Sequence, residues 1–363
     1  MPVEFIGMVG ASYYSEGTAN GGALIDLPYL DKFVRAYEDG GFDWTLVPYA
    51  SVSPETNVLT AAVLERTERL KVFLAHRPGV DHPANAARTF ATLDQLSGGR
   101  LGIHIITGSS DTEQRREGDY LIKQDRYQRS AEYVHILKRL WTATEPVSHH
   151  GRFYEFDGYI PAIKPTRPIP LSIGGSSDAA YRLGGAEGDI FGLWGEPLAE
   201  TAQQIATVNA YADEAGRPHP RIWISFRPIM APTDELAWER AEKILGGIQR
   251  NFTTRPQHGD ARPQNTGSQR LLAAAAKGDK HDRALWMAPA AATNASGAST
   301  ALVGSPETIA AALLDYVDIG CDLLSIRGYD PVNDAVDLAR YVLPLVRAEL
   351  AQRAGASLLG AAP

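Results

Sequence analysis

The sequence predicts an α/β fold, a (β/α)8 TIM barrel with insertions. Short apolar runs alternate with amphipathic segments along most of the 363 residues, and the alternation repeats eight times. Such alternation indicates a parallel sheet covered by helices. No G-x-G-x-x-G follows the first apolar run, so the dinucleotide fingerprint of the main rival fold, an open doubly wound sheet, is absent. Eight repeats without that motif favour a closed barrel.

The elements follow from the period of the apolar residues. The expected strands are Glu4–Val9, Trp44–Tyr49, Leu70–Arg77, Leu101–Thr107, Leu171–Gly174, Ile190–Trp194, Ile222–Met230 and Leu323–Tyr329. The segments between them have the amphipathic pattern of surface helices. The expected helices are Leu27–Tyr37, Asn57–Thr67, Pro83–Leu96, Arg126–Trp141, Ala179–Gly185, Leu198–Ala215, Asp234–Ile248, Pro306–Ile319 and Asp334–Ala351.

Two stretches interrupt the alternation. In residues 149–170 aromatic and polar residues alternate before a proline-rich lead, which predicts a β-ribbon and a loop. Residues 250–300 are polar and alanine-rich, and a loop of that length inside a compact domain is usually functional or disordered. Its place between the seventh and eighth strands favours a long mobile lid over a passive surface loop. We expect one barrel domain over residues 1–350 and a weakly ordered tail over 351–363.

Composition limits the classes of function. The chain is 44% hydrophobic and 21% charged, with a net charge of −8 and no long run of lysine or arginine. These values predict a soluble globular protein and argue against a nucleic acid partner. No secretory or membrane-spanning segment is recognisable, which predicts a cytoplasmic location without a membrane partner. The single cysteine, Cys321, excludes an internal disulfide framework and a cysteine-based metal cluster.

The stretch LSIGGSSD, residues 171–178, is the most informative in the chain. It reads as a strand, a glycine–serine turn and the start of a helix. The glycines allow close approach of the backbone, and the free N–H groups of the helix start point the same way, so the turn forms an anion cradle. With the aromatic Trp194 on the next strand, the cradle suggests a phosphorylated planar cofactor such as FMN.

Residues at the carboxyl ends of the predicted strands form the candidate site, because barrels of this type carry their chemistry there. Few of these residues are acids. No spacing fits a metal site, a carboxylate pair for glycoside hydrolysis or a G-x-S-x-G nucleophile elbow. The chain itself therefore supplies few reactive groups, which favours an enzyme whose chemistry is carried by a cofactor.

Several separated motifs resemble those of one family. They are HPANAARTFATLDQLSGGRLGIHIITGSS, DRYQRSAEY, IGGSSD, LWGEP and TALVGSPETIA, in this order along the chain. Together they resemble the bacterial luciferase-like flavin monooxygenases, and most of all the FMNH2-dependent alkanesulfonate monooxygenases. The resemblance extends over residues 3–346. It implies reduced FMN supplied by a separate NAD(P)H-dependent FMN reductase, dioxygen as co-substrate, and a homodimer or homotetramer.

The resemblance also implies site residues. Tyr127 matches a tyrosine whose hydroxyl reaches the flavin phosphate, Trp194 an active-site tryptophan near the flavin, and Tyr329 an active-site tyrosine. The other matching FMN-binding positions are Thr107, Gly174, Gly175, Ser176 and Ser177, with the serines at the phosphate.

Departures from the family concern the substrate. Arg227 stands where the family has a histidine on the seventh strand, and Arg327 where it usually has a small polar residue. Arg327 and Tyr329 are two residues apart, so they share a face of a regular strand. Arg227 is also expected to face inward, and the two arginines are predicted to clamp an oxyanion.

Two further residues are candidates. His76 ends the third predicted strand, where it is expected beside the flavin ring or dioxygen as a hydrogen-bond donor or base. A structural histidine at the strand end is the alternative, with equal weight. Glu196, which closely follows Trp194, is expected to hold an arginine or the entering chain.

These observations predict a two-component FMNH2- and O2-dependent monooxygenase that oxidises a small organosulfonate to an aldehyde and sulfite. The alternatives keep the fold. They are a luciferase-like monooxygenase acting on a sulfone, a carbonyl compound or a nitrogen heterocycle, a deazaflavin-dependent oxidoreductase, and a flavin-binding subunit without turnover.

Overall fold

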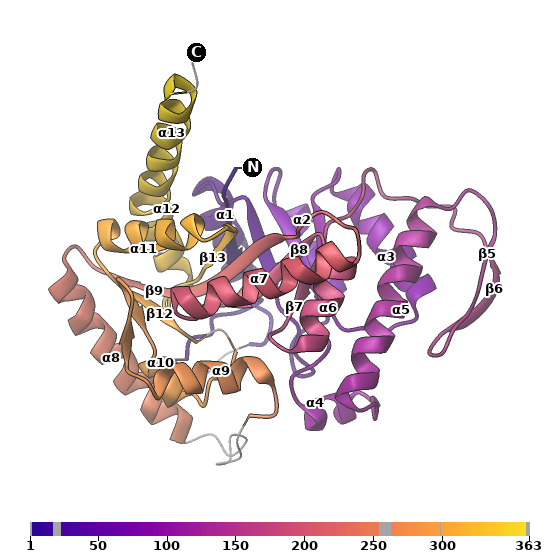
Figure 1. Ribbon diagram of the computed structural model, residues 1–363, viewed down its shortest axis with the longest axis horizontal. Helices are drawn as coiled ribbons and strands as arrows, with labels where there is room; N and C mark the ends of the chain where they lie inside the picture. Colours follow the sequence, from indigo (N-terminus) through magenta and orange to yellow (C-terminus); the bar gives the residue numbers. More distant parts are fainter. Residues whose placement is uncertain (1, 17–22, 254–262, 298, 361–363) are drawn as a thin grey trace.

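The computed structural model describes residues 2–16, 23–253, 263–297 and 299–360. Eight parallel strands form its centre (Figure 1). They are β1 (Glu4–Met8), β2 (Trp44–Val47), β3 (Lys71–His76), β4 (Leu101–Ile105), β7 (Leu171–Gly174), β8 (Ile190–Trp194), β9 (Arg221–Met230) and β13 (Cys321–Ile326). Each strand pairs with the next in this order, and β13 pairs back to β1, so the sheet closes into a barrel. The predicted (β/α)8 class is confirmed.

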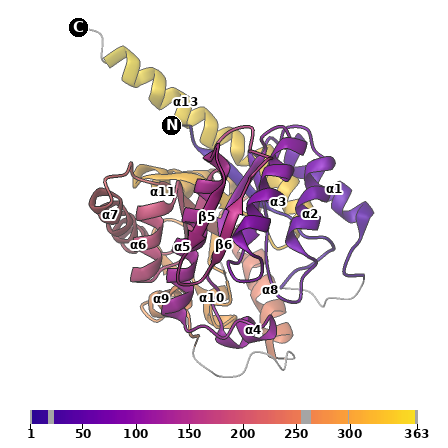
Figure 2. The ribbon, with the colours of Figure 1, turned by 90° about the vertical axis from the view of Figure 1, so that its right-hand side faces the viewer.

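Helices cover the outside of the barrel (Figures 1 and 2). Their apolar faces meet the outward residues of the strands in the main hydrophobic core. Side chains such as Asp26 and Ser305 cap helix starts by accepting a backbone N–H. The helices are α1 (Leu27–Asp39), α2 (Thr56–Glu65), α3 (Pro83–Leu96), α4 (Asp111–Arg116), α5 (Lys123–Thr142), α6 (Asp178–Glu187), α7 (Leu198–Glu214), α8 (Asp234–Thr253), α11 (Pro306–Asp318), α12 (Pro331–Tyr341) and α13 (Leu343–Gly360).

Aromatic side chains fill the amino-terminal half of the barrel interior. The ring of Trp44 stacks on Phe73 with centroids 4.2 Å apart, and Phe73 contacts Trp223 at 5.1 Å. Ile6, Ile190 and Leu323 belong to the same cluster. Because this layer closes the barrel from below, space for a ligand is left only above it, toward the carboxyl ends of the strands.

The predicted β-ribbon is present. Strands β5 (Val147–His150) and β6 (Glu155–Tyr159) pair antiparallel at the side of the molecule, beyond α5 (Figure 1). Glu132 on α5 accepts hydrogen bonds from the backbone N–H groups of Phe153 and Tyr154. The ribbon is thus fixed to the barrel by a partly buried carboxylate.

The insertion between the seventh and eighth barrel strands is more structured than the sequence indicates. Strand β9 runs past the barrel and pairs in parallel with β12 (Ala301–Gly304). β11 (Leu285–Trp286) pairs antiparallel with β12, and β10 (Lys280–His281) pairs antiparallel with β11. Two helices, α9 (Thr266–Ala275) and α10 (Ala288–Ala292), complete it. These strands are too short to show a period in the sequence. The part of the predicted lid between residues 254 and 262 lies outside the described residues.

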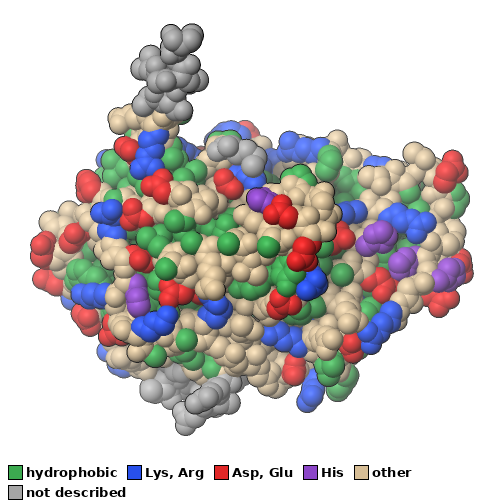
Figure 3. Space-filling model, viewed as in Figure 1, with side chains coloured by type: hydrophobic (Ala, Val, Ile, Leu, Met, Phe, Trp, Pro, Cys, Tyr) green, Lys and Arg blue, Asp and Glu red, His purple; other side chains and the backbone are tan. Residues whose placement is uncertain are grey.

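The C-terminal helix α13 projects away from the barrel (Figures 1 and 2). It continues through Gly360, so residues 351–360, predicted as a tail, are helical. Acidic and basic side chains intermingle over the face in Figure 3. A search of the described residues finds no helix with the length and hydropathy to cross a bilayer.

Candidate active site

A cavity of about 420 Å³ opens at the carboxyl ends of the barrel strands. This volume is typical of small-molecule and cofactor sites. Side chains alternate along a strand, so every second strand residue faces the barrel axis and reaches the cavity. The wall positions on or just after the barrel strands are Met8, Leu46, Ala75, Arg77, His104, Ile106, Gly174, Gly192, Trp194, Trp223, Ser225, Arg227, Ser325 and Arg327.

One end of the cavity is the turn between β7 and α6. Gly174, Gly175, Ser176 and Ser177, which the sequence predicts to bind FMN, all line it. Gly175 has φ +142°, and a Cβ there would lie 2.8 Å from Ala180 Cβ and 3.1 Å from the Tyr127 hydroxyl. The side chain of Ser177 caps α6 by accepting the N–H of Ala180. The turn needs glycine for its conformation, and its open side leaves the space that an anion requires.

Two side chains on α5 face this turn. Tyr127 and Lys123 are four residues apart, hence on one face of the helix, and both line the cavity. Lys123 Nζ donates to Thr266 Oγ1 at 3.3 Å. Burial, together with Arg126, lowers the pKa of Lys123. Sequence analysis missed Lys123, although its spacing from Tyr127 was the signal. Thr107, after β4, also lines the cavity as predicted.

The cavity is roofed by the insertion. Asn265, Thr266 and Gly267 at the start of α9 line it, with Ser296 and Gly297. A Cβ on Gly267 would lie 2.9 Å from the ring of Trp194, so the helix start sits directly on that indole. Glu196 holds Arg270 of α9 through a bidentate ion pair, with a shortest distance of 2.6 Å. The structure thus provides the arginine that was expected for Glu196.

His104 lies at the floor of the cavity. Its Nδ1 is 2.9 Å from Ser172 Oγ, and its ring is 4.8 Å from that of Trp223. Gly174 and Gly192 on the neighbouring strands leave room for the imidazole, since a Cβ on either would contact it. Burial lowers the pKa of His104 to about 4, so the imidazole is neutral at physiological pH. The sequence signal, an inward position on β4, was not used.

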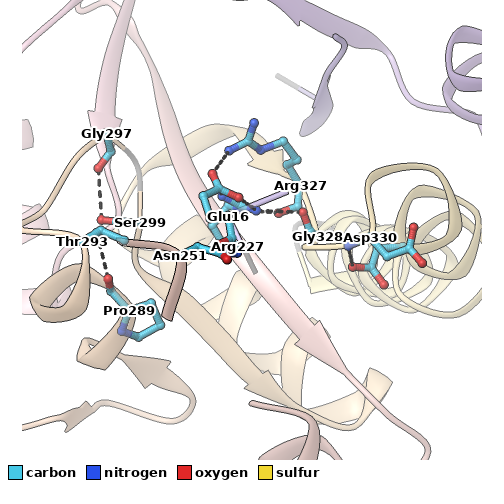
Figure 4. A network of polar contacts seen from close by, with 11 residues as sticks. Glu16, Arg227, Asn251, Pro289, Thr293, Gly297, Ser299, Arg327, Gly328 and Asp330 are labelled. Atoms are coloured by element: carbon cyan, nitrogen blue, oxygen red, sulfur yellow. Dashed lines mark hydrogen bonds and ion pairs between the residues drawn. The ribbon is translucent and has the colours of Figure 1, made fainter. Parts of the chain in front are cut away.

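The other end of the cavity carries Arg227 and Arg327, and both bind one carboxylate of the chain (Figure 4). Glu16, in the loop after β1, accepts from Arg227 Nη1 at 2.7 Å and Nη2 at 2.9 Å, and from Arg327 Nη2 at 3.1 Å. Burial alone raises the pKa of Glu16, but the two guanidinium charges outweigh it and hold that pKa far below its usual range. Sequence analysis did not identify Glu16.

A family model described as luciferase-like monooxygenase matches residues 8–323. The chain belongs to this family. The protein is therefore a flavin-dependent monooxygenase. The glycine–serine turn and the roof of the cavity both lie within the matched residues.

Solved structures of this luciferase-like fold are similar over nearly the whole chain. A riboflavin lyase with modified FMN and riboflavin has 20% identity and a TM-score of 0.80, over 96% of this chain and 92% of that one. An EDTA monooxygenase from Chelativorans sp. BNC1 has 18% identity and a TM-score of 0.77, over 96% and 94%. An F420-dependent secondary alcohol dehydrogenase has 19% identity and a TM-score of 0.70, over 95% and 99%. At these identities the likeness concerns the fold, and luciferase-like proteins with this fold differ in cofactor and substrate.

Two predicted site residues lie outside the wall of the luciferase-like cavity. His76 is the outward neighbour of Arg77 on β3, and its Nε2 is 2.7 Å from the hydroxyl of Tyr133 in the helix layer. The expectation that it lies beside the flavin is therefore corrected by strand alternation. Burial lowers the pKa of His76 to about 3.

Tyr329 is the second predicted site residue that does not line the cavity. Strand β13 ends at Ile326, so Arg327 and Tyr329 lie in the following loop and the shared strand face does not apply. The ring of Tyr329 lies under the Arg227 guanidinium, 4.0 Å from its Cζ. Burial raises the pKa of Tyr329 to about 12. The ring thus supports an arginine of the cavity from behind.

Within the described residues, no group of His, Cys, Asp and Glu side chains is arranged to hold a metal ion.

Proposed function

We propose that the protein is an FMNH2- and O2-dependent monooxygenase that converts a small organosulfonate into an aldehyde and sulfite. One observation carries this proposal: a single cavity joins a glycine–serine turn suited to a phosphate with an arginine pair suited to an anionic head group. In the balanced reaction, R-CH2-SO3⁻, FMNH2 and O2 give R-CHO, HSO3⁻, FMN and water.

The described residues fit the cofactor. The Tyr127 hydroxyl lies against the turn of Ser176 and Ser177 where the phosphate would bind, and Lys123 lines the same cavity and would supply a positive charge. Thr107, His104 and Trp194 line the space between that turn and the arginines, which suits the planar ring. Bound reduced FMN supplies the electrons that activate dioxygen.

The two arginines have different roles in this proposal. Arg227 is 4% exposed, and it also donates from Nε to Arg327 O at 2.8 Å and from Nη2 to Gly328 O at 3.0 Å. Four of its five N–H donors are occupied, so it positions Glu16 and the loop after β13. Arg327 makes one side-chain hydrogen bond among the described residues, to Glu16, and the rest of its guanidinium is left for the sulfonate oxygens.

The roof excludes water from the reacting atoms. The start of α9 covers Trp194, and the buried Glu196 carboxylate, 2% exposed, fixes that helix through Arg270. A dry cavity protects activated oxygen from decay to peroxide before it meets the substrate. His104, neutral at the floor, is placed to exchange a proton with a group bound above it.

We further propose that a separate NAD(P)H-dependent reductase delivers reduced FMN, that the protein forms a homodimer or homotetramer, and that it works in the cytoplasm. The absence of a G-x-G-x-x-G motif supports the first of these, because the chain has no recognisable nicotinamide site of its own.

The test is sulfite release. The protein is incubated with FMN, NADH, a flavin reductase and a series of linear alkanesulfonates, and sulfite and aldehyde are measured together. We expect equal amounts of both from at least one substrate, and loss of both in Arg327→Gln. Arg283→Gln, which removes a surface arginine paired with Asp315, is the matched control and should retain activity. If no alkanesulfonate gives sulfite while FMNH2 is still consumed, the sulfonate assignment is wrong. If turnover requires reduced deazaflavin in place of FMNH2, the cofactor assignment is wrong.

A further inference from the structure

The structure places an acid of the chain at the substrate end of the cavity, and it suggests a basis for selectivity. We propose that Glu16 is a specificity-determining residue that tunes the arginine site to ligands with a single negative charge. The inference rests on the proposed function only in taking this end of the cavity as the place where the substrate head group binds. It concerns binding and does not depend on the reaction that follows.

The first step is that Arg227 and Glu16 form one neutral unit. The two guanidinium nitrogens Nη1 and Nη2 bind the two carboxylate oxygens in a fork, at 2.7 and 2.9 Å. Such bidentate pairs are the strongest and most specific of side-chain ion pairs. With Tyr329 against one face and two backbone carbonyls on two of its three remaining donors, Arg227 is fixed in place.

The second step is that Arg327 carries the remaining charge. Its Nη2 donates to Glu16 Oε1 at 3.1 Å, and its side chain, 20% exposed, lines the cavity (Figure 4). Burial and the neighbouring Arg227 lower the pKa of Arg327, although Glu16 acts in the opposite direction, so its positive charge is only partly compensated within the protein. An anionic ligand at Arg327 adds to this compensation.

The charged side chains at this end of the cavity do not cancel. Two guanidinium groups and one carboxylate give a net charge of +1, and the lining residues beside them on β1, β9 and β13, which are Met8, Ser225, Phe226 and Ser325, are neutral. One negative charge on a ligand is balanced there. A second has no counter-charge at this end of the cavity, and in a site screened from water an unbalanced charge is costly.

Glu16 is also held by its backbone. Its carbonyl oxygen accepts from Asn251 Nδ2 of α8 at 3.1 Å, so the residue is fixed from two sides. The carboxylate is therefore a permanent part of the wall, and its charge acts on every ligand that enters.

The experiment removes the charge and keeps the shape. Glu16→Gln is compared with the wild type and with Glu4→Gln. Glu4 is a matched control, because its carboxylate also binds two cations, Lys71 and Arg221, but at the opposite end of β1. Each FMN-loaded protein is titrated by calorimetry, in low-chloride buffer, with methanesulfonamide, methanesulfonate and methanedisulfonate, which carry zero, one and two negative charges.

Coulomb energy is proportional to the ligand charge, so the logarithm of the gain in affinity doubles from the monoanion to the dianion. In Glu16→Gln we expect methanesulfonate to bind about tenfold more tightly and methanedisulfonate about a hundredfold, with methanesulfonamide unchanged. Glu4→Gln should bind all three as the wild type does. Equal changes for the three ligands, or weaker binding of the anions, would contradict the proposal.

A second variant covers the case in which Glu16→Gln folds poorly. Arg327→Gln leaves the Arg227–Glu16 pair intact and should lose methanesulfonate binding by more than tenfold, while unchanged binding would sink the inference. The two proposals remain separable. Charge-dependent binding without sulfite release leaves this inference standing and removes the sulfonate reaction, whereas sulfite release with charge-independent binding does the reverse.

Discussion

Arg270 of the roof helix forms a bidentate ion pair with Glu196, which closely follows the cavity tryptophan Trp194 at the end of β8. Arg270 Nε is 2.8 Å from Glu196 Oε1, and Nη2 is 2.6 Å from Oε2. The carboxylate is 2% exposed, whereas the guanidinium is 29% exposed. The roof of the cavity therefore depends on a charge buried in the barrel wall.

Removing this pair is expected to loosen the roof. Arg270→Leu leaves a buried carboxylate without its cation, which should lower the free energy of unfolding by about 3 kcal/mol. Urea unfolding measures the loss, and hydrogen exchange should be faster in α9. The control is Lys277→Met. It breaks an exposed ion pair between Lys277 of the insertion and Glu200 of α7, and it should lower the free energy of unfolding by less than about 1 kcal/mol. Similar losses in both variants would show that the roof is held by other contacts.

The turn after β7 should not tolerate a side chain at Gly175. Gly175→Ala adds a Cβ 2.8 Å from Ala180 Cβ at a φ of +142°, so the turn must shift. We expect FMN affinity, measured by quenching of flavin fluorescence, to fall at least about tenfold. Gly216→Ala, also at positive φ but with nothing within 4 Å of the new Cβ, is the control. Unchanged FMN binding in Gly175→Ala would place the phosphate elsewhere.

Lys123 should recognise the phosphate rather than the ring. Lys123→Met is expected to weaken FMN binding about tenfold and leave riboflavin binding unchanged, because riboflavin lacks the phosphate. Raising the salt concentration should reduce the difference. Lys138→Met is the control, since Lys138 lies on the same helix but binds Glu187 on the outside of the barrel. Equal weakening for both flavins would mean that Lys123 acts through the roof residue Thr266.

Tyr329 is expected to act through its ring. Its hydroxyl is buried and has no hydrogen-bond partner in the described part of the chain. Tyr329→Phe should therefore keep kcat within about twofold and the free energy of unfolding within about 0.5 kcal/mol. Tyr329→Leu removes the ring under Arg227 and should cost about 1 to 2 kcal/mol. A large fall in kcat for Tyr329→Phe would instead support the active-site tyrosine that the family resemblance implies.

His76 should make the fold sensitive to acid. Its pKa is lowered by burial to about 3 from an ordinary 6.5, so between these values the unfolded chain binds a proton that the folded protein does not. Stability is therefore lost as the pH falls through this window, at up to about 1.4 kcal/mol per pH unit. Unfolding titrations from pH 6.5 to 4 should show a slope smaller by that amount in His76→Gln.

Local patterns in the chain were sufficient to predict the barrel and the glycine–serine turn after its fifth strand. The eight strands and their order follow from apolar runs separated by amphipathic segments, and the glycine–serine turn needs particular residue types at fixed neighbours. The strand pattern and the glycine–serine turn are both signals carried by residues close in sequence. The same holds for Lys123, whose spacing from Tyr127 was available and was overlooked.

The wrong placement of His76 concerns strand alternation. His76 is the last residue of β3 and Arg77 follows it directly, so only one of them faces the cavity, and the aromatic layer at Phe73 fixes which. A sequence shows that two neighbours point to opposite sides. It takes the packed barrel to show which side is the interior.

The sequence by itself thus determined the fold, the glycine–serine turn and the presence of two arginines near one end of a cavity. Only the tertiary structure decided what those arginines bind. Glu16 is separated from Arg227 by 211 residues and from Arg327 by 311, and it lies in a loop with no periodic pattern. Barrel closure brings the first, seventh and eighth strands side by side, and that closure creates the charge balance on which the choice of ligand is proposed to depend.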